Sequence, residues 1–322
     1  MTDTLSDVLR AVRLNGAIFF SINASAPWVA ETPPGTALIP HLMPGIGHVI
    51  DYHVIVGGTC WGGLLDEPAI RLEAGDIIVF PQGDPHVLSS APGMRGETDV
   101  GVYRAARRAR LPLALSIDGG GRDGAQIICG FLGCEARPFN PLLSTLPRVI
   151  HLPARGQTDG ILHRLVELAL AESSAPQPGG ESVLAHISEL LFVEVVRRYV
   201  ATLPPENVGW LAGLRDELIG RALQKLHQSP AHDWSLEELA KEAGMSRSML
   251  AERFVHFVGM PPMQYLAQWR MQLAASMLSA SQASLAEIAA RVGYGSEAAL
   301  SRAFKRSAGV SPSLYRQGKR QA

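Results

Sequence analysis

SLEELAKEAGMSRSMLAERF (Ser235–Phe254) and SLAEIAARVGYGSEAALSRAF (Ser284–Phe304) are two stretches of one chain that repeat each other. Four positions of the first stretch recur 49 residues later, and after one inserted residue six more recur at an offset of 50. Such a repeat indicates two copies of one supersecondary unit. The first copy contributes Ser235, Glu238, Ala240, Gly244, Ser246, Leu250, Phe254, Gly259, Pro262 and Tyr265, and the second contributes Ser284, Glu287, Ala289, Gly293, Ser296, Leu300, Phe304, Gly309, Pro312 and Tyr315.

Each copy predicts a helix, a tight turn and a second helix. A Ser followed three residues later by a Glu predicts a capping box at Ser235 and Ser284. Gly244 and Gly293 then end the first helix, because a left-handed backbone is needed there, and a second Ser caps the next helix. One copy is equally consistent with a helical hairpin that only packs. Two copies with matched caps and turns favour helix-turn-helix units, whose second helix enters the DNA major groove.

A continuous amphipathic helix is predicted between the two copies, with Tyr265, Trp269 and Met277 on one face. It would hold the two units at a fixed separation. Recognition helices on one side of B-DNA lie about 34 Å apart, which is one helical turn.

The second copy continues into a longer motif, which runs IAARVGYGS over Ile288–Ser296 and AFKRSAGVSPSLYR over Ala303–Arg316. This motif resembles the signature of AraC/XylS-type transcription regulators, and the resemblance covers Leu214–Arg316. It implies two helix-turn-helix motifs that bind adjacent major grooves near a promoter, and it favours activation over repression.

Helical spacing predicts which side chains face the DNA. Arg302 is the expected base reader, because a guanidinium pairs with two acceptors of guanine. Lys305, Arg306 and Arg316 are expected to bind phosphates, which adds affinity without sequence information. The alternative for each charge is a solvated surface side chain. The full predicted set is Arg247, Ser248 and Glu252 in the first unit and Ser296, Glu297, Arg302, Lys305, Arg306 and Arg316 in the second.

The first half of the chain has the pattern of β structure. Between residues 14 and 117, apolar runs such as Val49–Val56 and Ile77–Phe80 alternate with turn residues, which is typical of a small sandwich or barrel. Gln126–Leu132 predicts one more strand. Gly160–Ser173 and Glu181–Thr202 then carry apolar residues at helical spacing.

One stretch of this half is more specific: GDIIVFPQGDPH, over Gly75–His86. A Gly-Asp turn leads into an apolar strand, Pro and Gly make a turn, and a His follows. Together with Ala26–Trp28 and Tyr52–Trp61, this stretch resembles cupin β-barrels. The resemblance, to the cupin-type sensor domain of some AraC-like regulators, spans Asp7–Thr202.

The cupin resemblance raises the question of a metal. Many cupins hold one with a His-x-His pair, a Glu and a later His, which His86 matches here. The pair itself is absent, so dioxygenase-type catalysis is not expected. His53 and His86 with Cys60 or Cys129 are candidate ligands for an effector, zinc or another divalent metal. The alternative is a turn histidine bonded to nearby Asp84, with two buried cysteines acting as small hydrophobic residues.

The chain is expected to have an α+β fold of two domains. Residues 1–203 form a cupin-like effector and dimerisation domain, with a β-barrel or sandwich at about 7–150 and a helical pair at about 158–203. The apolar face of Glu181–Thr202 is the expected dimer contact, unless it packs on its own barrel. Residues 204–213 are the predicted linker, and 214–322 form an all-α DNA-binding domain. That domain holds a first helix-turn-helix at 235–258, a linker helix at 262–279 and a second helix-turn-helix at 284–307.

Composition narrows the cellular setting. Three cysteines are too few for a disulfide framework, although Cys129 and Cys134 are candidates for a redox pair, with structural cysteines as the alternative. No stretch is apolar enough for a membrane span, and Met1–Arg10 lacks an export signal. From Arg215 onward 14 Lys and Arg stand against 9 Asp and Glu, whereas the preceding residues hold 15 against 21. A basic C-terminal third favours a nucleic-acid partner.

The sequence therefore predicts a cytoplasmic, sequence-specific DNA-binding transcription regulator, an effector-responsive activator and not an enzyme. Its expected partners are double-stranded promoter DNA, RNA polymerase, a second copy of the chain and an unidentified small-molecule or redox effector, with no membrane. The alternative is a cupin-type metal-dependent enzyme, or a redox or metal sensor, with an accessory DNA-binding domain.

Overall fold

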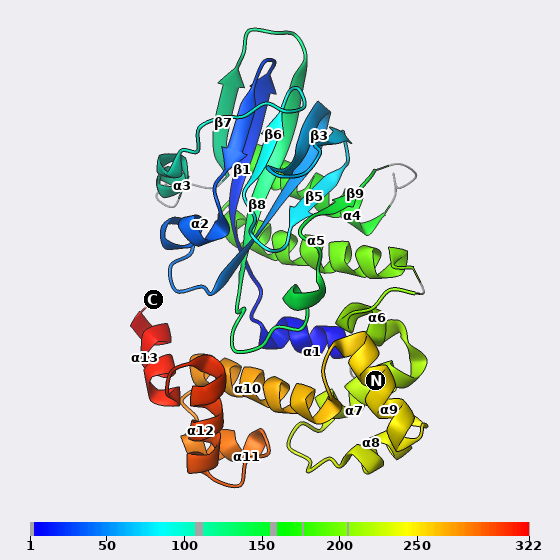
Figure 1. The fold of residues 1–322 in the computed structure, drawn as a ribbon. Coiled ribbons are helices and arrows are strands. Elements are labelled where there is room, and N and C mark those ends of the chain that lie inside the picture. The colour runs from blue at the N-terminus through cyan, green and yellow to red at the C-terminus, as the bar shows by residue number, and fades with distance from the viewer. Residues whose placement is uncertain (1–2, 107–111, 155–159, 176, 205, 322) are drawn as a thin grey trace. The chain divides into compact units, whose positions relative to one another are not determined.

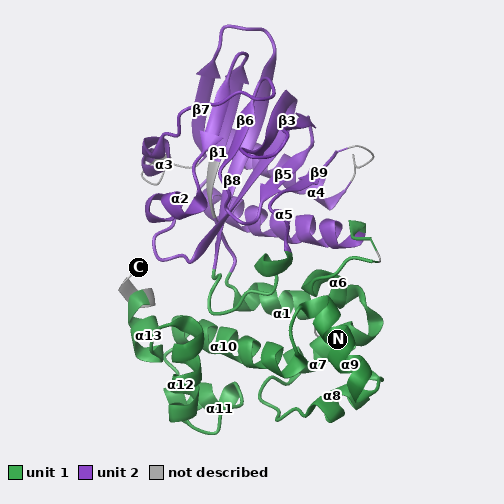
Figure 2. Ribbon diagram, in the orientation of Figure 1, with its two compact units in different colours: residues 1–13, 135–145, 202–322 green, residues 14–134, 146–201 purple. Residues whose placement is uncertain are grey.

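The computed structural model divides into two compact units, shown as a ribbon in Figure 1 and coloured by unit in Figure 2. One unit is helical, and the other is built on a β-sheet. The structure describes residues 3–106, 112–154, 160–175, 177–204 and 206–321. The helical unit contains Met1–Arg13, Glu135–Thr145 and Thr202–Ala322, and the sheet unit contains Leu14–Cys134 and Leu146–Ala201.

Nine strands among the described residues form one bent sheet in the order β2-β6-β3-β8-β1-β7, with β4, β5 and β9 joined at the side. The strands are β1 (Asn15–Ser25), β2 (Val29–Thr32), β3 (His48–Leu64), β4 (Ile70–Glu73), β5 (Ile77–Phe80), β6 (His86–Ser89), β7 (Leu113–Asp118), β8 (Gly124–Cys134) and β9 (Ile150–Leu152). The first half of β3 pairs with β5 and β8, and its second half pairs with β4 and β6. This change of partners along one strand bends the sheet into a barrel.

Alternation along β3 decides which side chains point into the barrel. Val49 and Ile55 belong to the buried core that fills it. Asp51 and His53 lie on the same face of the strand, because successive strand residues point to opposite faces. Two polar side chains are therefore buried among apolar ones. The core also includes Phe20, Trp28, Leu38, Leu72, Phe80, Leu88, Ile127 and Phe131.

α4 (Ile161–Ser174) and α5 (Gly180–Thr202) pack on the outer face of the sheet. The hydroxyl groups of Tyr52 on β3 and Ser188 on α5 are buried and hydrogen-bonded at 2.8 Å. Gly130 leaves room for the tyrosine ring, since a Cβ at this position would lie 2.1 Å from it. The apolar face of the predicted dimer helix is thus used to cover its own barrel. The predicted start of the helical pair, at residue 158, lies outside the described residues.

Two short helices interrupt the region that the sequence predicts as β structure. α2 (Gly35–Leu42) lies between β2 and β3, and α3 (Val100–Ala106) lies between β6 and β7. α2 contains Pro40, which local propensity disfavours in a helix. Its Leu38 and Leu42 are buried, so packing against the barrel stabilises a helix that is too short to be stable alone. The β prediction is wrong at these two segments, and for α2 the reason is this packing.

The C-terminal helices follow the predicted pattern. They are α6 (Trp210–Arg215), α7 (Glu217–Gln228), α8 (Leu236–Ala243), α9 (Arg247–Val258), α10 (Pro262–Ala280), α11 (Leu285–Arg291), α12 (Glu297–Ala308) and α13 (Pro312–Gln321). α8–α9 and α11–α12 coincide with the two predicted helix-turn-helix units, and α10 coincides with the predicted linker helix. The predicted linker at 204–213 overlaps α6. Trp210 is 1% exposed and donates its indole N–H to the hydroxyl of Tyr265 at 2.8 Å, so this end of the segment is packed.

α1 (Thr4–Ala11) and residues 135–145 belong to the helical unit, although the sequence places both with the barrel. α1 packs against α7 and α10. The ring of Phe139 meets that of Tyr265 edge-on at 5.4 Å. The N–H of Glu135 donates to the carbonyl of Val12 at 2.8 Å, which joins the two segments to each other. Long-range packing, and not order along the chain, assigns them to this unit.

In the second helix-turn-helix, Gly293 lies between α11 and α12, and Gly309 follows α12. Both glycines have a left-handed backbone, with φ of 78° and 79°. A Cβ at Gly293 would lie 2.7 Å from the carbonyl oxygen of Ala231, whereas no described atom lies within 4 Å of a Cβ at Gly309. We expect Gly309→Ala to lower the free energy of unfolding by about 1–2 kcal/mol, the cost of a left-handed L-residue. Gly293→Ala should lower it further, because backbone must move. Urea unfolding measures both, and equal losses would contradict this contact.

Candidate nucleic-acid interface and barrel cavity

α9 and α12, the second helices of the two units, begin and end in the same way. The hydroxyl oxygens of Ser246 and Ser296 each accept the N–H of the residue three positions later, at 3.2 Å. Gly259 and Gly309 end the helices with a left-handed backbone. Both helices therefore have 12 residues and the same boundaries within the repeat.

The predicted capping boxes form at one of the two sites. At Ser284, the hydroxyl accepts the N–H of Glu287 at 3.2 Å, and the glutamate carboxylate accepts the N–H of Ser284 at 2.7 Å. At Ser235, the hydroxyl accepts the N–H of Glu238 at 3.1 Å, but the carboxylate lies 2.8 Å from the ring of His232. The full capping box predicted at Ser235 is wrong, because the histidine takes the carboxylate.

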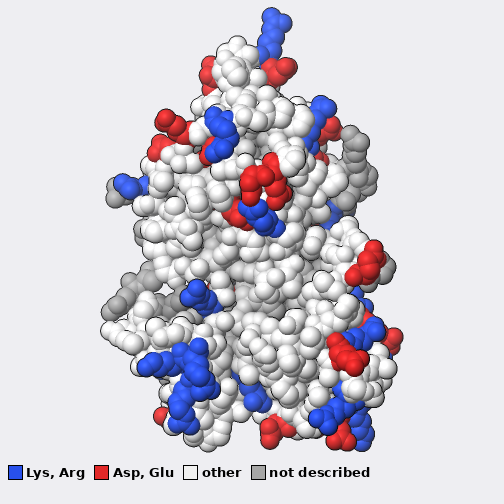
Figure 3. Space-filling view, viewed as in Figure 1, with Lys and Arg blue, Asp and Glu red and all other residues white. Residues whose placement is uncertain are grey.

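The predicted DNA-binding side chains are exposed, with one exception. Arg247, Ser248 and Glu252 are exposed on α9, and Ser296, Glu297, Arg302, Lys305 and Arg306 are exposed at the start of α12 and along it. Figure 3 shows Lys and Arg side chains gathered on the helical unit, over the region of α12 and α13 and over that of α8 and α9. The positive charge over α12 and α13 suits a polyanionic partner, whereas α8 and α9 carry acidic side chains among the basic ones.

Arg316 is the exception. Its Nη2 donates to the carbonyl of Ala283 at 2.6 Å, and the side chain is only partly exposed. This bond fixes α13 against the residue before the cap of α11, so the side chain supports the fold. Arg253 on α9 also has a structural role, because its guanidinium pairs with Asp216, the N-cap residue of α7.

Gln272 on α10 is buried and makes two hydrogen bonds, one buried and one part-buried. Its Nε2 donates to the carbonyl of Ala11 at 3.0 Å, and its Oε1 accepts the N–H of Phe139 at 3.1 Å. Ala11 ends α1, which precedes β1, and Phe139 lies in the segment that follows β8. β1 and β8 pair with each other from Asn15–Gly133 onward. One side chain of the linker helix thus binds both chain segments that extend from the β1–β8 pair.

The barrel encloses a cavity of about 260 Å³. Its wall is mainly apolar and includes Phe20, Ile22, Leu88, Val102, Leu115 and Phe131. A few polar side chains also line it, among them His53, Tyr103 and Cys129. A concave, mostly apolar space with few polar groups is the usual form of a small-molecule site.

His53 meets His86 next to this cavity. Their Nε2 atoms lie 2.8 Å apart, and both rings are buried. Nδ1 of His86 lies 2.9 Å from the main-chain carbonyl of Asp84. Burial lowers the pKa of both histidines, that of His86 to about 4, so both rings are neutral at pH 7. Burial also raises the pKa of the Asp51 carboxyl, which lies 3.9 Å from Nδ1 of His86.

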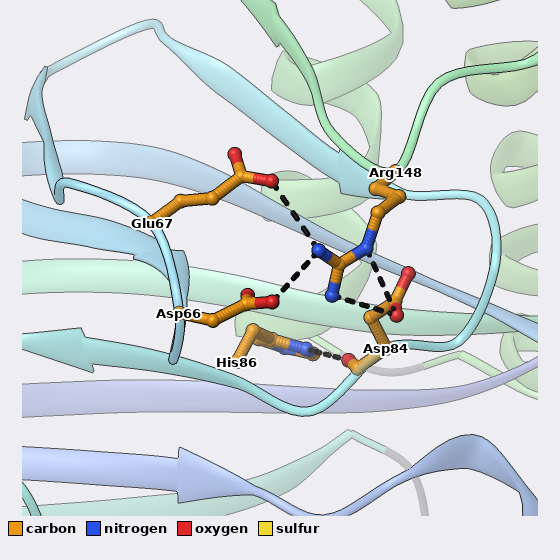
Figure 4. A network of polar contacts seen from close by, with 5 residues as sticks. All are labelled: Asp66, Glu67, Asp84, His86 and Arg148. Carbon is orange, nitrogen blue, oxygen red and sulfur yellow. Dashed lines mark hydrogen bonds and ion pairs between the residues drawn. The ribbon is translucent and has the colours of Figure 1, made fainter.

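Asp84 connects the histidine pair to a surface ion network, drawn in Figure 4. Nη2 of Arg148 lies 3.0 Å from the Asp84 carboxylate, and Nη1 lies 3.0 Å from Asp66 and 3.3 Å from Glu67. The hydrogen bonds that the guanidinium donates to Asp66 and Asp84 raise its pKa. Figure 4 shows Arg148 held between the two loops, with His86 directed at the Asp84 main chain. The arginine thereby ties the turn before β4 to the turn before β6.

The four predicted effector or metal residues do not form a metal site. His53 and His86 meet, Cys129 lines the cavity, and Cys60 is buried in the barrel core. Within the part of the chain that the structure describes, no group of three or more His, Cys, Asp or Glu is arranged to hold a metal ion. His86 bonded to Asp84, with buried cysteines beside it, matches the simpler alternative. Cys129 and Cys134 are both buried thiols and form no redox disulfide in the described residues.

Sequence reasoning missed three residues that matter here. Asp51 is the only acidic residue within the apolar run Val49–Val56, and this pattern could have identified it from the sequence. Tyr103 lies on α3, in a region interpreted as β structure. Gln272 is a polar residue on the buried side of an amphipathic helix, and only the packing of α1 and residues 135–145 gives it a role.

Comparisons with known proteins agree with this architecture. Residues 3–201 match the Cupin family, and residues 239–318 match the Helix-turn-helix domain family. The chain is 34% identical to a Streptomyces lividans protein described as an AraC-like transcription regulator, with 98% of each chain covered. It is 29% identical to the HTH-type transcriptional regulator AlkR of Acinetobacter baylyi, with 98% and 99% covered. The predicted fold class, a cupin-like barrel with two C-terminal helix-turn-helix motifs, is confirmed.

Two further relatives add detail. The RCS-specific HTH-type transcriptional activator RclR of Escherichia coli is 27% identical, with 88% of this chain and 89% of that protein covered. The solved DNA-binding domain of AdpA, in complex with a target DNA, is 33% identical over 33% of this chain and 95% of that chain, with a TM-score of 0.32. In the described residues, no helix has both the length and the apolar character needed to cross a membrane.

We expect the thiols of the folded chain to react slowly with Ellman's reagent, because the thiolate is the reactive form. All three cysteines are buried, and burial raises the pKa of Cys60 to about 12 and also raises that of Cys129. All three should react once urea unfolds the chain. Ala91→Cys, at an exposed position, is the control for a fast native reaction. A wild-type thiol that reacts as fast as this control would contradict the burial.

Proposed function

The chain belongs to the AraC-like transcription regulators, and we propose that it is an effector-responsive activator that binds promoter DNA with α9 and α12 in successive major grooves. One observation carries the proposal: two exposed helices with identical caps project from units joined by one continuous helix, α10. The relatives are transcription regulators, so the alternative of a cupin-type enzyme is not favoured.

The exposed side chains divide into two roles. Arg302 reads a base, because a guanidinium can pair with both acceptors of guanine, whereas Lys305 and Arg306 bind phosphates. On α9, Arg247 is an exposed cation at the helix start, whereas Glu252 occupies the position that Arg302 has in the second copy. Met249, 47% exposed one turn from the cap, offers an apolar surface to a thymine methyl group. Arg316 is left out of this set because it is bonded to Ala283.

The proposed effector site is the barrel cavity, and the proposed link to DNA binding is Gln272. Occupation of the cavity would change the β1–β8 pair that forms part of its wall. α1 and residues 135–145 extend from that pair and are held by Gln272 on α10. A change in their position would therefore reach the helix that sets the separation of α9 and α12.

The proposed partners include RNA polymerase and a second copy of the chain, in the cytoplasm. The second copy is supported by apolar side chains that remain on the solvent side of the helical pair. Ile161 and Leu168 on α4 are 56% and 49% exposed, and Val183 and Leu190 on α5 are 39% and 54% exposed. Exposed apolar side chains on these two helices are suited to a contact between copies.

The DNA-binding roles predict two different defects. Arg302→Ala should weaken binding to the region upstream of the chain's own gene by about 1–3 kcal/mol and relax specificity at one base pair. Lys305→Ala should weaken binding uniformly across sequences and reduce the salt dependence by about one ion. Fluorescence anisotropy at several salt concentrations separates the two effects. Arg71→Ala, at an exposed position on β4, is the control. If Arg302→Ala behaves like this control, the base-reading assignment fails.

Gln272→Leu should loosen both segments that the glutamine binds. The substitution removes the partner of the buried Ala11 carbonyl, at a cost of about 1–3 kcal/mol, and that of the part-buried Phe139 N–H, at a smaller cost. Hydrogen–deuterium exchange should therefore accelerate in peptides that cover residues 3–13 and 135–145. Gln264→Leu, at an exposed position of the same helix, should leave exchange unchanged. Equal exchange in the two variants would show that Gln272 does not hold these segments.

A further inference from the structure

Hydrogen bonding fixes the proton positions in the buried histidine pair. The carbonyl oxygen of Asp84 can only accept, so Nδ1 of His86 carries a hydrogen and donates to it at 2.9 Å. A neutral imidazole has one N–H, so Nε2 of His86 is an acceptor. Nε2 of His53, 2.8 Å away, must then be the donor. Nδ1 of His53 is left as a bare acceptor.

This acceptor has no partner in the described structure. Nδ1 of His53 is buried and unpaired among the described residues, and the residue is 3% exposed. Its side chain lines the 260 Å³ cavity. An unpaired buried acceptor costs free energy, and a donor placed in the adjacent cavity would recover it. The unpaired acceptor and the cavity are separate observations that meet in one side chain, that of His53.

The cavity wall limits the rest of the ligand. A dry apolar cavity of about 150 Å³ holds benzene, so about 260 Å³ suits a substituted ring or two small fused rings. The charged side chains among the described lining residues are Glu31, Glu97 and Asp99. Glu31 is paired with Arg95, which lowers its pKa and keeps it ionised. Acidic side chains and a bare nitrogen lone pair both disfavour an anion.

We propose that the barrel cavity binds a small neutral molecule of one or two rings, whose hydroxyl or N–H group donates a hydrogen bond to Nδ1 of His53. This assignment rests on the proposed function, because it names the chemical class of the effector. It also gives the two histidines a role that needs no metal: His86 and Asp84 hold His53 in the tautomer that accepts.

Three matched probes test the assignment on the full chain by isothermal titration calorimetry. 4-Ethylphenol carries the donor, 4-ethylanisole has the same ring without it, and 4-ethylbenzoate is anionic. 4-Ethylphenol should bind about fivefold to tenfold more tightly than 4-ethylanisole, which is the contribution of one hydrogen bond, and 4-ethylbenzoate should bind most weakly. No saturable binding of 4-ethylphenol at millimolar concentrations, or tighter binding of the benzoate, would overturn the proposal.

Two variants locate the binding. His53→Phe keeps a ring and removes the acceptor, so it should bind 4-ethylphenol and 4-ethylanisole equally. Leu115→Trp fills the cavity and should abolish both. Circular dichroism and DNA affinity check that each variant is folded. A preference for the phenol that survives in His53→Phe would overturn the role of Nδ1, and the wild-type probe series stands even if a variant does not fold.

The same samples separate this inference from the proposed function. DNA anisotropy is measured with and without 4-ethylphenol. If the phenol binds with the expected pattern but leaves DNA affinity and reporter transcription unchanged, the cavity assignment holds and the effector role fails. If DNA binding depends on Arg302 while none of the probes binds, the regulator assignment holds and the ligand class is wrong.

Discussion

The burial of α10 on both of its long faces is the constraint on which the helical unit depends. In its first half, the Tyr265 hydroxyl accepts the indole N–H of Trp210 and hydrogen-bonds His227 at 2.8 Å. The His227 ring also stacks on Trp269 at 4.2 Å, and burial lowers its pKa to about 3. In its second half, α10 supplies Met271, Ala274, Ala275 and Leu278 to the core formed by α11 and α12. Two helix-turn-helix cores therefore share one helix. Since 19 helical residues span about 28 Å, this helix alone determines most of the separation between them.

In the barrel, three ionisable side chains are buried in their uncharged forms. His53, His86 and Asp51 are almost completely buried, and burial shifts the pKa of each toward its neutral form. The histidines satisfy one another and the Asp84 carbonyl, so the charged state that burial disfavours is not needed. Among the described residues, Nδ1 of His53 and both carboxyl oxygens of Asp51 are buried without a hydrogen-bond partner. Glu31, paired with Arg95, lines the cavity, and away from the histidines Arg148 and three carboxylates meet in contact with solvent and tie two turns together.

The barrel and the helical unit around α10 are joined through the covalent chain. β1 and β8 pair along most of their length, and each contributes side chains to the cavity wall. The segments before β1 and after β8 remain together, through the bond between Glu135 and Val12, and both are fixed to α10 by Gln272. A coupling between ligand and DNA requires an element whose position both sites influence. The proposed coupling would use the paired strands and their two extensions, because Gln272 hydrogen-bonds both extensions within the helical unit.

Features with local causes could be predicted from the order of residues. Serine caps, glycine turns and the period of apolar residues are set by neighbours within a few positions, so both recognition helices, the linker helix and the basic end follow from the order of residues alone. The barrel strands followed from alternation and turn residues in the same way. Most of the remaining features depend on contacts between residues that are far apart in the sequence. The carboxylate of Glu238 pairs with His232 and so does not complete the capping box at Ser235. Arg316 hydrogen-bonds the carbonyl of Ala283. α2 is helical although it contains Pro40. The contact between His53 and His86 joins residues 33 positions apart, and that between Gln272 and Ala11 joins residues 261 apart. Their geometry depends on strand register and helix packing, which no local pattern encodes.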